Sequence, residues 1–304
     1  MRFVLQIFCI FASQNELNMR YYVVDAFADQ LFGGNPAGVV LLGKQVFPKE
    51  QLMLQVAAEL RYSETAFVQQ NGGQEFTIRY FTPADEVELC GHATIATFGV
   101  LFQEGILKEG DRCVYHTQAG DLNAIAGRKV MMQMATPRLI RTLDEPDLLD
   151  EVYQAVGCSR EGLDLLPQIV STGLPDIMLP ISDVKTLNAL RPDMAAVTRL
   201  TERLQTVSIH AFAFGDDGYT AHVRDFAPLY DIDEESATGT ANAALTYYLF
   251  GNRLISSPSK CTFLQGEVMQ RPSVIATTLE ITNEVCDIWV GGESRIVAKG
   301  ELAI

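Results

Sequence analysis

A glutamate at the start of an expected β-strand is the first residue whose type and position suit acid–base chemistry. Glu64 stands in SETAFV (residues 63–68), where an expected helix and a short loop give way to an apolar strand. A carboxylate that enters such a strand loses part of its hydration. This raises its pKa towards neutrality and suits it to general acid–base catalysis. The alternative is a solvated glutamate at a strand edge, the more common environment for this residue type.

A second candidate is the segment CGHAT (residues 90–94), which opens an expected buried helix. The N-terminus of such a helix has free N–H donors and the positive end of the helix dipole, so it can hold a carboxylate. His92 could orient or protonate a substrate there, and Gly91 could help to bind the substrate's carboxylate. The alternative is a histidine that the backbone satisfies at the start of a helix.

A third candidate is EESATGTA (residues 234–241), which opens another expected buried helix in the same way. Thr238, Gly239 and Thr240 offer hydroxyl and amide donors where an anion could dock. The alternative is a plain capping segment, because Ser and Thr are favoured at helix caps.

The elements that must position these residues are two helices with almost no polar face. They cover His92–Gln103 (HATIATFGVLFQ) and Thr240–Phe250 (TANAALTYYLF), and a helix that is apolar nearly all round is buried on all sides. Short strand patterns surround both helices. We interpret the pattern as an internal duplication with a period of about 150 residues. The expected fold class is α/β (α+β), with two pseudo-symmetric lobes, each a curved mixed sheet around one central helix.

The expected lobe boundary lies near Thr136–Pro146, where two prolines combine with charge. This gives a first lobe of residues 19–137 and a second lobe of residues 138–284. Strands in residues 285–304 could complete the first lobe, but the sequence does not settle this.

The charge and the cysteines exclude several classes of function. The net charge of −15 repels phosphate backbones, so we expect no binding to nucleic acid. The six cysteines form no CxxC or zinc-like spacing, which indicates reduced, mostly buried thiols in a cytoplasmic protein and no metal site. There is no Rossmann glycine fingerprint and no P-loop, so no cofactor is expected.

Residues 1–18 include one short apolar run behind a single arginine. The run is too short to span a membrane as a helix. It could be the core of a secretory signal. Our interpretation is a disordered or non-native extension, with Met19 as the true start and no membrane contact.

Five segments in this order and spacing resemble the PhzF family, which is named for a phenazine-biosynthesis isomerase. They are VDAF…GGNPAGVV, SETAFV, IRYFTP…EVELCGHAT, EESATGTA and QGEVMQRPS, and the match covers residues 21–300. The resemblance implies a fold similar to that of diaminopimelate epimerase and proline racemase. In that fold two α/β lobes enclose the active site in the cleft between them.

The resemblance also implies roles for individual residues. Glu64 matches the family's catalytic glutamate, and His92 matches the histidine of its GH-x-T loop. Glu235 falls where the family usually has Asp in E-D-P-x-T-G-S. Ser236 replaces the usual Pro, and Thr240 replaces the usual Ser. These departures leave the reach of Glu235 and the substrate open.

The expected function is a cofactor-independent isomerase that acts on a small carboxylate-bearing metabolite, and we expect a homodimer. Glu64 would move the proton, His92 and Glu235 would stabilise the shifting charge, and Gly91, Gly239 and Thr240 would bind the carboxylate. One alternative is a racemase or epimerase of an amino or hydroxy acid. Such enzymes use two opposed cysteines, and Cys90 has Thr238 rather than a thiol opposite it. The other alternative is a non-catalytic metabolite-binding protein.

Overall fold

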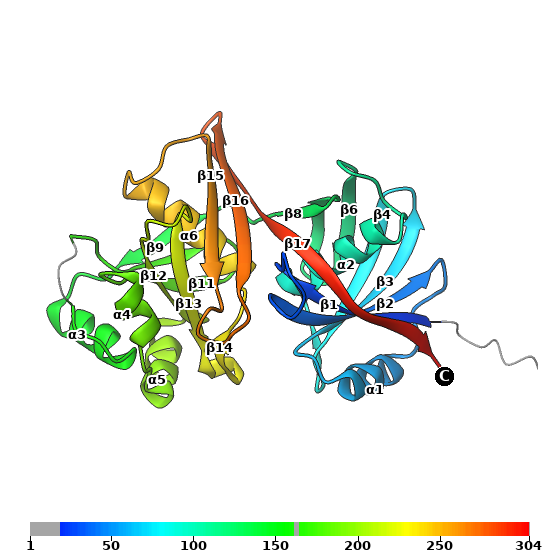
Figure 1. Cartoon of the computed structure of the whole chain (residues 1–304), viewed down its shortest axis with the longest axis horizontal. Helices are drawn as coiled ribbons and strands as arrows, with labels where there is room; N and C mark the ends of the chain where they lie inside the picture. Colours follow the sequence, from blue (N-terminus) through cyan, green and yellow to red (C-terminus); the bar gives the residue numbers. More distant parts are fainter. Residues whose placement is uncertain (1–18, 161–163, 304) are drawn as a thin grey trace, which may run out of the picture.

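The computed structural model describes residues 19–160 and 164–303, and it has a mixed α/β fold in two halves (Figure 1). The predicted extension, residues 1–18, lies outside the described residues. Among the residues that the structure describes, no helix is both long enough and apolar enough to cross a bilayer.

The first half contains eight strands and two helices. The strands are β1 (Met19–Ala26), β2 (Asn35–Gly43), β3 (Thr65–Gly72), β4 (Glu75–Phe81), β5 (Glu86–Val87), β6 (Arg112–Thr117), β7 (Gly120–Ile125) and β8 (Lys129–Gln133). The helices are α1 (Glu50–Leu60) and α2 (Gly91–Gln103).

The second half contains eight more strands and four α-helices. The strands are β9 (Arg138–Thr142), β10 (Gln168–Ser171), β11 (Pro175–Pro180), β12 (Ser208–Ala213), β13 (Ala221–Ala227), β14 (Ile232–Glu235), β15 (Ser259–Gln265) and β16 (Ser273–Thr282). The helices are α3 (Pro146–Ala155), α4 (Val184–Ala189), α5 (Met194–Leu204) and α6 (Gly239–Gly251), with a 3-10 turn, η1, at Pro228–Tyr230.

The order and sense of strand pairing repeat between the halves. In the first half, neighbouring strands pair in the order β1, β2, β3, β4, β6, β7 and β8. The pairs β2–β3 and β4–β6 are parallel, and the pairs β1–β2, β3–β4, β6–β7 and β7–β8 are antiparallel. In the second half β10, β11, β12, β13, β15, β16 and β17 (Val285–Leu302) repeat the same senses. The repeat supports the interpretation of an internal duplication. It also makes the start of α2 equivalent to the start of α6.

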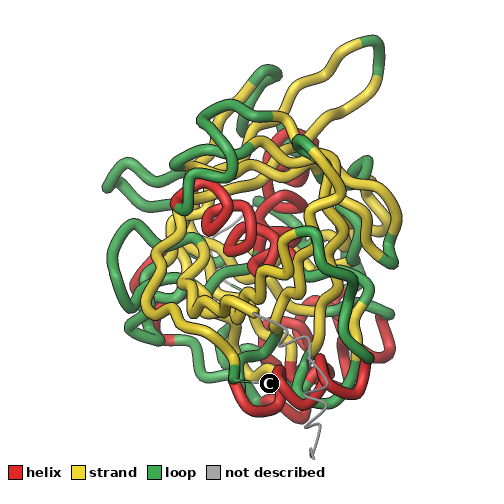
Figure 2. Tube along the Cα trace, turned by 90° about the vertical axis from the view of Figure 1, so that its right-hand side faces the viewer, coloured by secondary structure: helices red, strands yellow, loops and turns green. Residues whose placement is uncertain are grey.

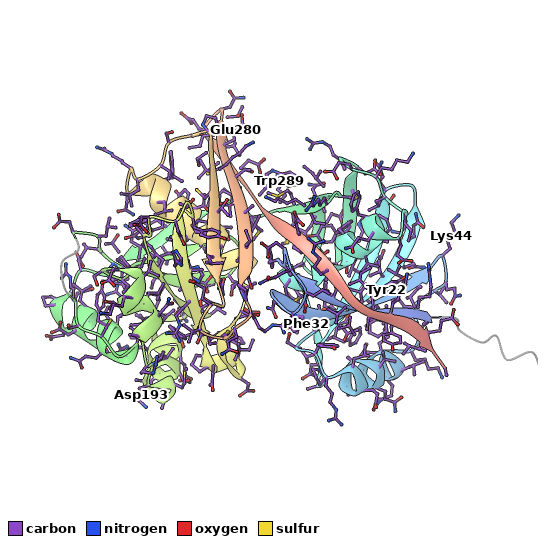
Figure 3. The ribbon with its side chains drawn as sticks, in the orientation of Figure 1. Tyr22, Phe32, Lys44, Asp193, Glu280 and Trp289 are labelled. Carbon is purple, nitrogen blue, oxygen red and sulfur yellow. The ribbon has the colours of Figure 1, made fainter. Side chains whose placement is uncertain are left out.

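Strand β17 runs through both halves. Its first part pairs with β16 and its last part pairs with β1, so the end of the chain does return to the first half. Trp289 lies at the crossing, where β17 pairs with β16 and β8 together (Figure 3). Because β17 also pairs with β8, the strands of the first half close around α2. The exact lobe limits stay a prediction.

Both apolar helices lie in the core, as their composition predicts. Helix α2 is buried from His92 to Leu101, and its Phe98 packs edge-to-face against Phe76 and Tyr115. Helix α6 packs against β10, β11, β16 and β17. Figure 2 shows helical turns in red enclosed by strands in yellow. A rigid core around each helix fixes where the helix begins, and both candidate site segments lie at those beginnings.

Candidate active site

The three predicted catalytic side chains meet at one place, although they come from three segments. Glu64 lies just before β3, His92 lies in the first turn of α2, and Glu235 ends β14. Glu64 Oε2 is 3.2 Å from His92 Nε2, and His92 Nδ1 is 3.7 Å from Glu235 Oε1. The imidazole therefore stands between two carboxyl groups, one from each half of the molecule.

Backbone contacts fix the position of Glu64. The Gly38 N–H donates to the Glu64 carbonyl at 3.0 Å. A Cβ on Gly38 would lie 2.6 Å from Thr65 Oγ1, so only glycine allows this close approach of β2 and β3. Glu64 Oε2 is buried and lies 3.2 Å from His92 Nε2, its ion-pair partner. His92 therefore holds this oxygen in a place shielded from water.

The expected rise in the pKa of Glu64 is wrong. Burial acts upward, but hydrogen bonding to His92 and the charge of His92 outweigh it, so the pKa of Glu64 is lowered. Burial acts downward on His92, yet its contacts with Cys90 and Glu64 raise the pKa of His92 well above its usual value. The resting pair is therefore a carboxylate base beside an imidazolium, because the opposite charge decides the balance.

Cys90 and Ser63 complete the surroundings of His92. Cys90 Sγ is 3.5 Å from His92 Nδ1, and Ser63 Oγ is 3.4 Å from Nε2. Burial first, and then the charge of Glu64, raise the pKa of Cys90 to about 11. Ligand atoms of Glu64, Cys90 and His92 lie within 4.8 Å of one another, close enough for one metal ion. The expectation from the sequence that the protein holds no metal stays a prediction.

Glu235 has a different environment from Glu64. Its Oε1 accepts a 2.9 Å hydrogen bond from Asn35 Nδ2, and its Oε2 lies 3.1 Å from Thr238 Oγ1. Burial is the largest effect on Glu235, and it raises the pKa of this group. The charge of His92 lowers the pKa, whereas the charges of Asp225 and Glu64 raise it further, and the resulting pKa is about 7. This carboxyl group can therefore exist as the neutral acid at neutral pH.

Asn35 is a site residue that the sequence did not single out, although its GGNPAG turn was noticeable. Its Nδ2 also donates to the Ala237 carbonyl at 3.1 Å, which ties β2 to the loop before α6. The preceding turn is held by Arg271, which donates to the carbonyls of Gly33 and Gly34 and forms a 2.7 Å ion pair with Asp25. The geometry of this turn therefore depends on side chains from both halves.

The expected carboxylate-binding residues lie where the sequence placed them. Gly91 begins α2, and Gly239 and Thr240 begin α6. Ser236 donates to the Gly34 carbonyl at 3.0 Å and so ties the segment before α6 to the turn before β2 in the first half. The binding of a substrate carboxylate by these helix starts stays a prediction.

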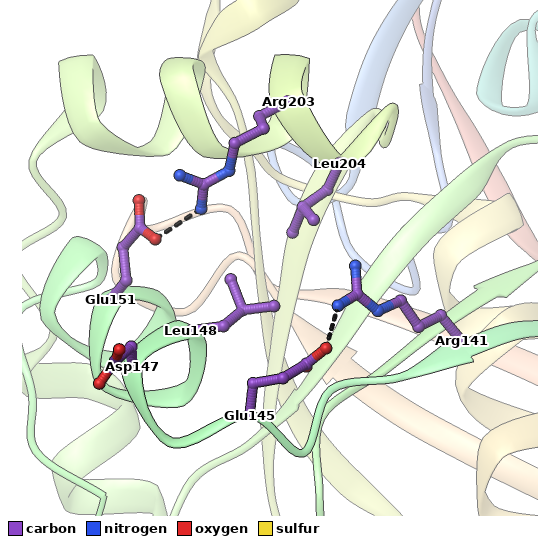
Figure 4. A pocket seen from close by; sticks show the side chains of 7 residues that line it. All are labelled: Arg141, Glu145, Asp147, Leu148, Glu151, Arg203 and Leu204. Carbon is purple, nitrogen blue, oxygen red and sulfur yellow. Dashed lines mark hydrogen bonds and ion pairs between the residues drawn. The ribbon is translucent and has the colours of Figure 1, made fainter.

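Two surface cavities lie elsewhere. The one in Figure 4 has a volume of about 420 Å³, and its two arginines already form ion pairs with Glu145 and Glu151. The other has a volume of about 530 Å³ and lies beside Trp289. Neither contains a predicted site residue.

Comparison with known proteins identifies the family. The family model described as "Phenazine biosynthesis-like protein" (PhzC-PhzF) matches residues 24–300. The chain belongs to the PhzF family. An "uncharacterized isomerase" of Deinococcus radiodurans is 33% identical over 295 residues, covering 92% of this chain and 94% of the relative. A Clostridium acetobutylicum protein of the same description is 31% identical over 300 residues, covering 93% and 97%.

Solved structures show the same fold. A PhzF-family protein from Enterococcus faecalis matches with a TM-score of 0.75 at 30% identity, covering 94% of this chain and all of that one. A hydroxyproline epimerase from Agrobacterium vitis, with bound trans-4-hydroxy-L-proline, matches with a TM-score of 0.62 at 12% identity, covering 94% and 91%. The latter likeness concerns the fold alone, and it agrees with the resemblance to proline racemases.

Proposed function

We propose that this PhzF-family protein is a cofactor-independent isomerase that shifts a proton on a small carboxylate-bearing metabolite. The observation that carries the proposal is the meeting of Glu64, His92 and Glu235 within 3.2 and 3.7 Å. Its relatives are named isomerases, which agrees with this chemistry. We also propose two pseudo-symmetric lobes and a cytoplasmic homodimer.

The charge states divide the work between the three side chains. Glu64, ionised beside His92, takes a proton from an activated carbon and returns it to another atom of the substrate. The His92 imidazolium stabilises negative charge that develops on the substrate during the transfer. Glu235 in its neutral form holds a polar substituent of the substrate without adding a second negative charge to the site. Each proton that leaves the substrate returns to it, so no oxidant or second substrate is needed.

The substrate class follows from the helix starts. The first turns of α2 and α6 have backbone N–H groups and positive dipole ends, which favour a carboxylate. The chain's net charge of −15 repels anions at long range, so such a local site has to supply the attraction. The hydroxyproline epimerase that shares the fold was solved with bound trans-4-hydroxy-L-proline, a small carboxylate-bearing molecule, which agrees with the same class here.

A racemase that uses two opposed thiols is the weaker candidate. Burial raises the pKa of Cys90 to about 11, so little thiolate is present at neutral pH. The equivalent N-cap position of α6 is Thr238, whose hydroxyl is a far weaker base than a thiolate.

The test is proton exchange in deuterated water, followed by NMR on a panel of small cyclic and linear carboxylates. We expect deuterium uptake with the wild-type protein and its loss with Glu64→Gln. Glu104→Gln is the matched control, because Glu104 has a similarly shielded side chain but pairs with Lys299 away from the site. Equal uptake by Glu64→Gln and the wild type would exclude Glu64 as the base.

A further inference from the structure

A cluster of polar side chains is buried directly behind Glu235, on strands that the mechanism above does not use. Asp176 on β11, Ser208 and His210 on β12, and Asp225 on β13 are each no more than 2% exposed. Ser208 Oγ lies 2.9 Å from Asp176 Oδ1 and 2.7 Å from Asp225 Oδ1. His210 Nδ1 lies 2.9 Å from the same Asp225 oxygen. Two carboxyl groups so far from water need a reason, because burying them is costly.

The Thr238 hydroxyl links this cluster to the site. Thr238 Oγ1 is 2.9 Å from Asp225 Oδ2 and 3.1 Å from Glu235 Oε2. Gln265 Nε2 donates to Thr238 Oγ1 at 3.1 Å. A hydroxyl has one hydrogen, so Thr238 can donate to only one of the two carboxyl groups at a time.

The surroundings of Asp225 decide which carboxyl group receives that hydrogen. The Ser208 hydroxyl lies against Oδ1, and in the tautomer with hydrogen on Nδ1 His210 donates to the same oxygen, which is the pattern of donors around a carboxylate anion. Ser208 also has one hydrogen for two carboxyl groups, so Asp176 must carry a proton when Ser208 donates to Asp225. Burial first, and then the charge of Asp225, raise the pKa of Asp176 well above its usual value, in agreement with this arrangement.

We propose that Asp225, acting through the Thr238 hydroxyl, holds Glu235 in its protonated form. The inference rests on the proposed function for the role of the neutral carboxyl group in the reaction, but not for the protonation itself. Thr238 donates to Asp225 Oδ2, and its oxygen is then available only as an acceptor on the Glu235 side. Glu235 keeps its proton on Oε2 and donates this hydrogen to Thr238 Oγ1. Asp225 and Thr238 are positioning residues, and Glu235 is the group that meets the substrate.

Other charged groups also face Glu235. His92 from α2 favours the ionised form of Glu235, whereas Glu64 from the loop before β3 and Asp225 from β13 disfavour it. Asp176 on β11 interacts with both Asp225 and Glu235. Asn35 from β2 donates to Oε1 whether or not Oε2 is protonated. The Thr238 hydroxyl is the contact that joins Asp225 to Glu235, so it is the one to alter.

The direction of a pKa shift tests the proposal without any substrate. The side-chain carboxyl carbons of glutamate are labelled with carbon-13 in the ligand-free protein, and the Glu235 signal is assigned by its absence in Glu235→Gln. The wild-type midpoint is expected near 7. In Thr238→Val the neutral acid loses its acceptor while the anion loses nothing, so the midpoint should fall by about one pH unit. If Thr238 instead donates to Glu235, the same change removes a donor from the anion, and the midpoint should rise.

Matched variants separate this effect from damage to the fold. Thr238→Ser keeps the hydroxyl and should titrate like the wild type. Thr246→Val removes another buried hydroxyl of α6, one that bonds to the Asn242 carbonyl and Thr277, and should also leave the midpoint in place. In Asp225→Asn the amide donates to Thr238 Oγ1 and turns the Thr238 hydrogen towards Glu235, so the midpoint should fall. An amide nitrogen–proton spectrum confirms that each variant is folded.

A rise or no change in Thr238→Val, no change in Asp225→Asn, or a wild-type midpoint near 4.5 would each overturn the inference. These results do not depend on deuterium uptake. A titration as expected, together with no uptake on any substrate, would leave the inference standing and reject the proposed function alone.

Discussion

In the first half of the molecule, α2 starts at Gly91 after the N-cap residue Cys90, and in the second half α6 starts at Gly239 after Thr238. The strand pairings make these two places equivalent. Around Cys90 lies an ion pair of Glu64 with His92, and around Thr238 lies a carboxyl group, Glu235, that stays neutral up to a pH of about 7.

The difference shows how one framework can hold two carboxyl groups in opposite states. Glu64 has a cationic neighbour from the helix next to it, and this outweighs its burial. Glu235 has an anionic neighbour, Asp225, on the strand behind it, and this adds to its burial. A base and an acid side by side at the same pH are what a proton-shifting site requires.

Removing the cation should have the largest effect on this contrast. His92→Gln deprives Glu64 of the charge that lowers its pKa, so the pKa of Glu64 should rise. The loss of charge stabilisation should reduce proton exchange by about 10²–10⁴-fold. The pH at which activity appears should move upward, which a profile of exchange rate against pH measures.

The control for this change is His116→Gln, because His116 also lies between two carboxylates, Glu75 and Asp121, but on an exposed sheet. Equal pH profiles for His92→Gln and the wild type would show that the ion pair does not set the charge of Glu64.

The neutral acid should show itself in stability. A carboxyl group whose pKa rises from 4.5 to about 7 on folding keeps its proton while the unfolded chain loses it. The protein therefore loses about 3 kcal/mol of stability from this group between pH 4.5 and 7, and nothing more above that. Residue 235 cannot titrate in Glu235→Gln. The difference in free energy of unfolding between this variant and the wild type should therefore shift by about 3 kcal/mol in favour of the variant between pH 4.5 and 7. Urea unfolding at several pH values measures this.

Glu280→Gln, at an exposed position of β16, should instead follow the wild-type curve. A constant difference between Glu235→Gln and the wild type across this range would mean that Glu235 ionises normally.

The turn that contacts Glu235 from the first half should contribute a smaller amount. Asn35→Ala removes the donor to Glu235 Oε1 and to the Ala237 carbonyl, both in a largely buried place. The loss should cost about 1–3 kcal/mol of stability. Asn123→Ala removes an exposed side-chain hydrogen bond to Gln133 and should cost much less. Similar thermal midpoints for the two variants would show that Asn35 does not hold the halves together at the site.

Much of this arrangement could be read from the sequence, and what was missed has a physical reason. The apolar composition of two helices predicts their burial, and the motifs around Glu64 and His92 lie where a strand or a helix begins. Asp225 could not be found, because it lies in VRDFA, where no local pattern shows which polar side chain is buried. The sign of the pKa shift of Glu64 was also out of reach, since it depends on a histidine brought to 3.2 Å by the fold.

The smallest expected effect concerns the thiol at the start of α2, and it sharpens the contrast with Thr238. Cys90→Ala removes a neutral, buried sulfur next to His92, so it should cost about 1 kcal/mol of stability through lost packing. Proton exchange should fall by no more than a few-fold, because the base is the Glu64 carboxylate and the thiol holds its proton. If the thiol acted as a base, this change would instead lower the rate of proton exchange by about 10²–10⁴-fold.

Alkylation should give the same answer, since a thiol with a pKa of about 11 reacts slowly with iodoacetamide at neutral pH. Rapid, substrate-protected inactivation would place Cys90 in the reaction and would make the two helix starts more alike in chemistry than their environments indicate.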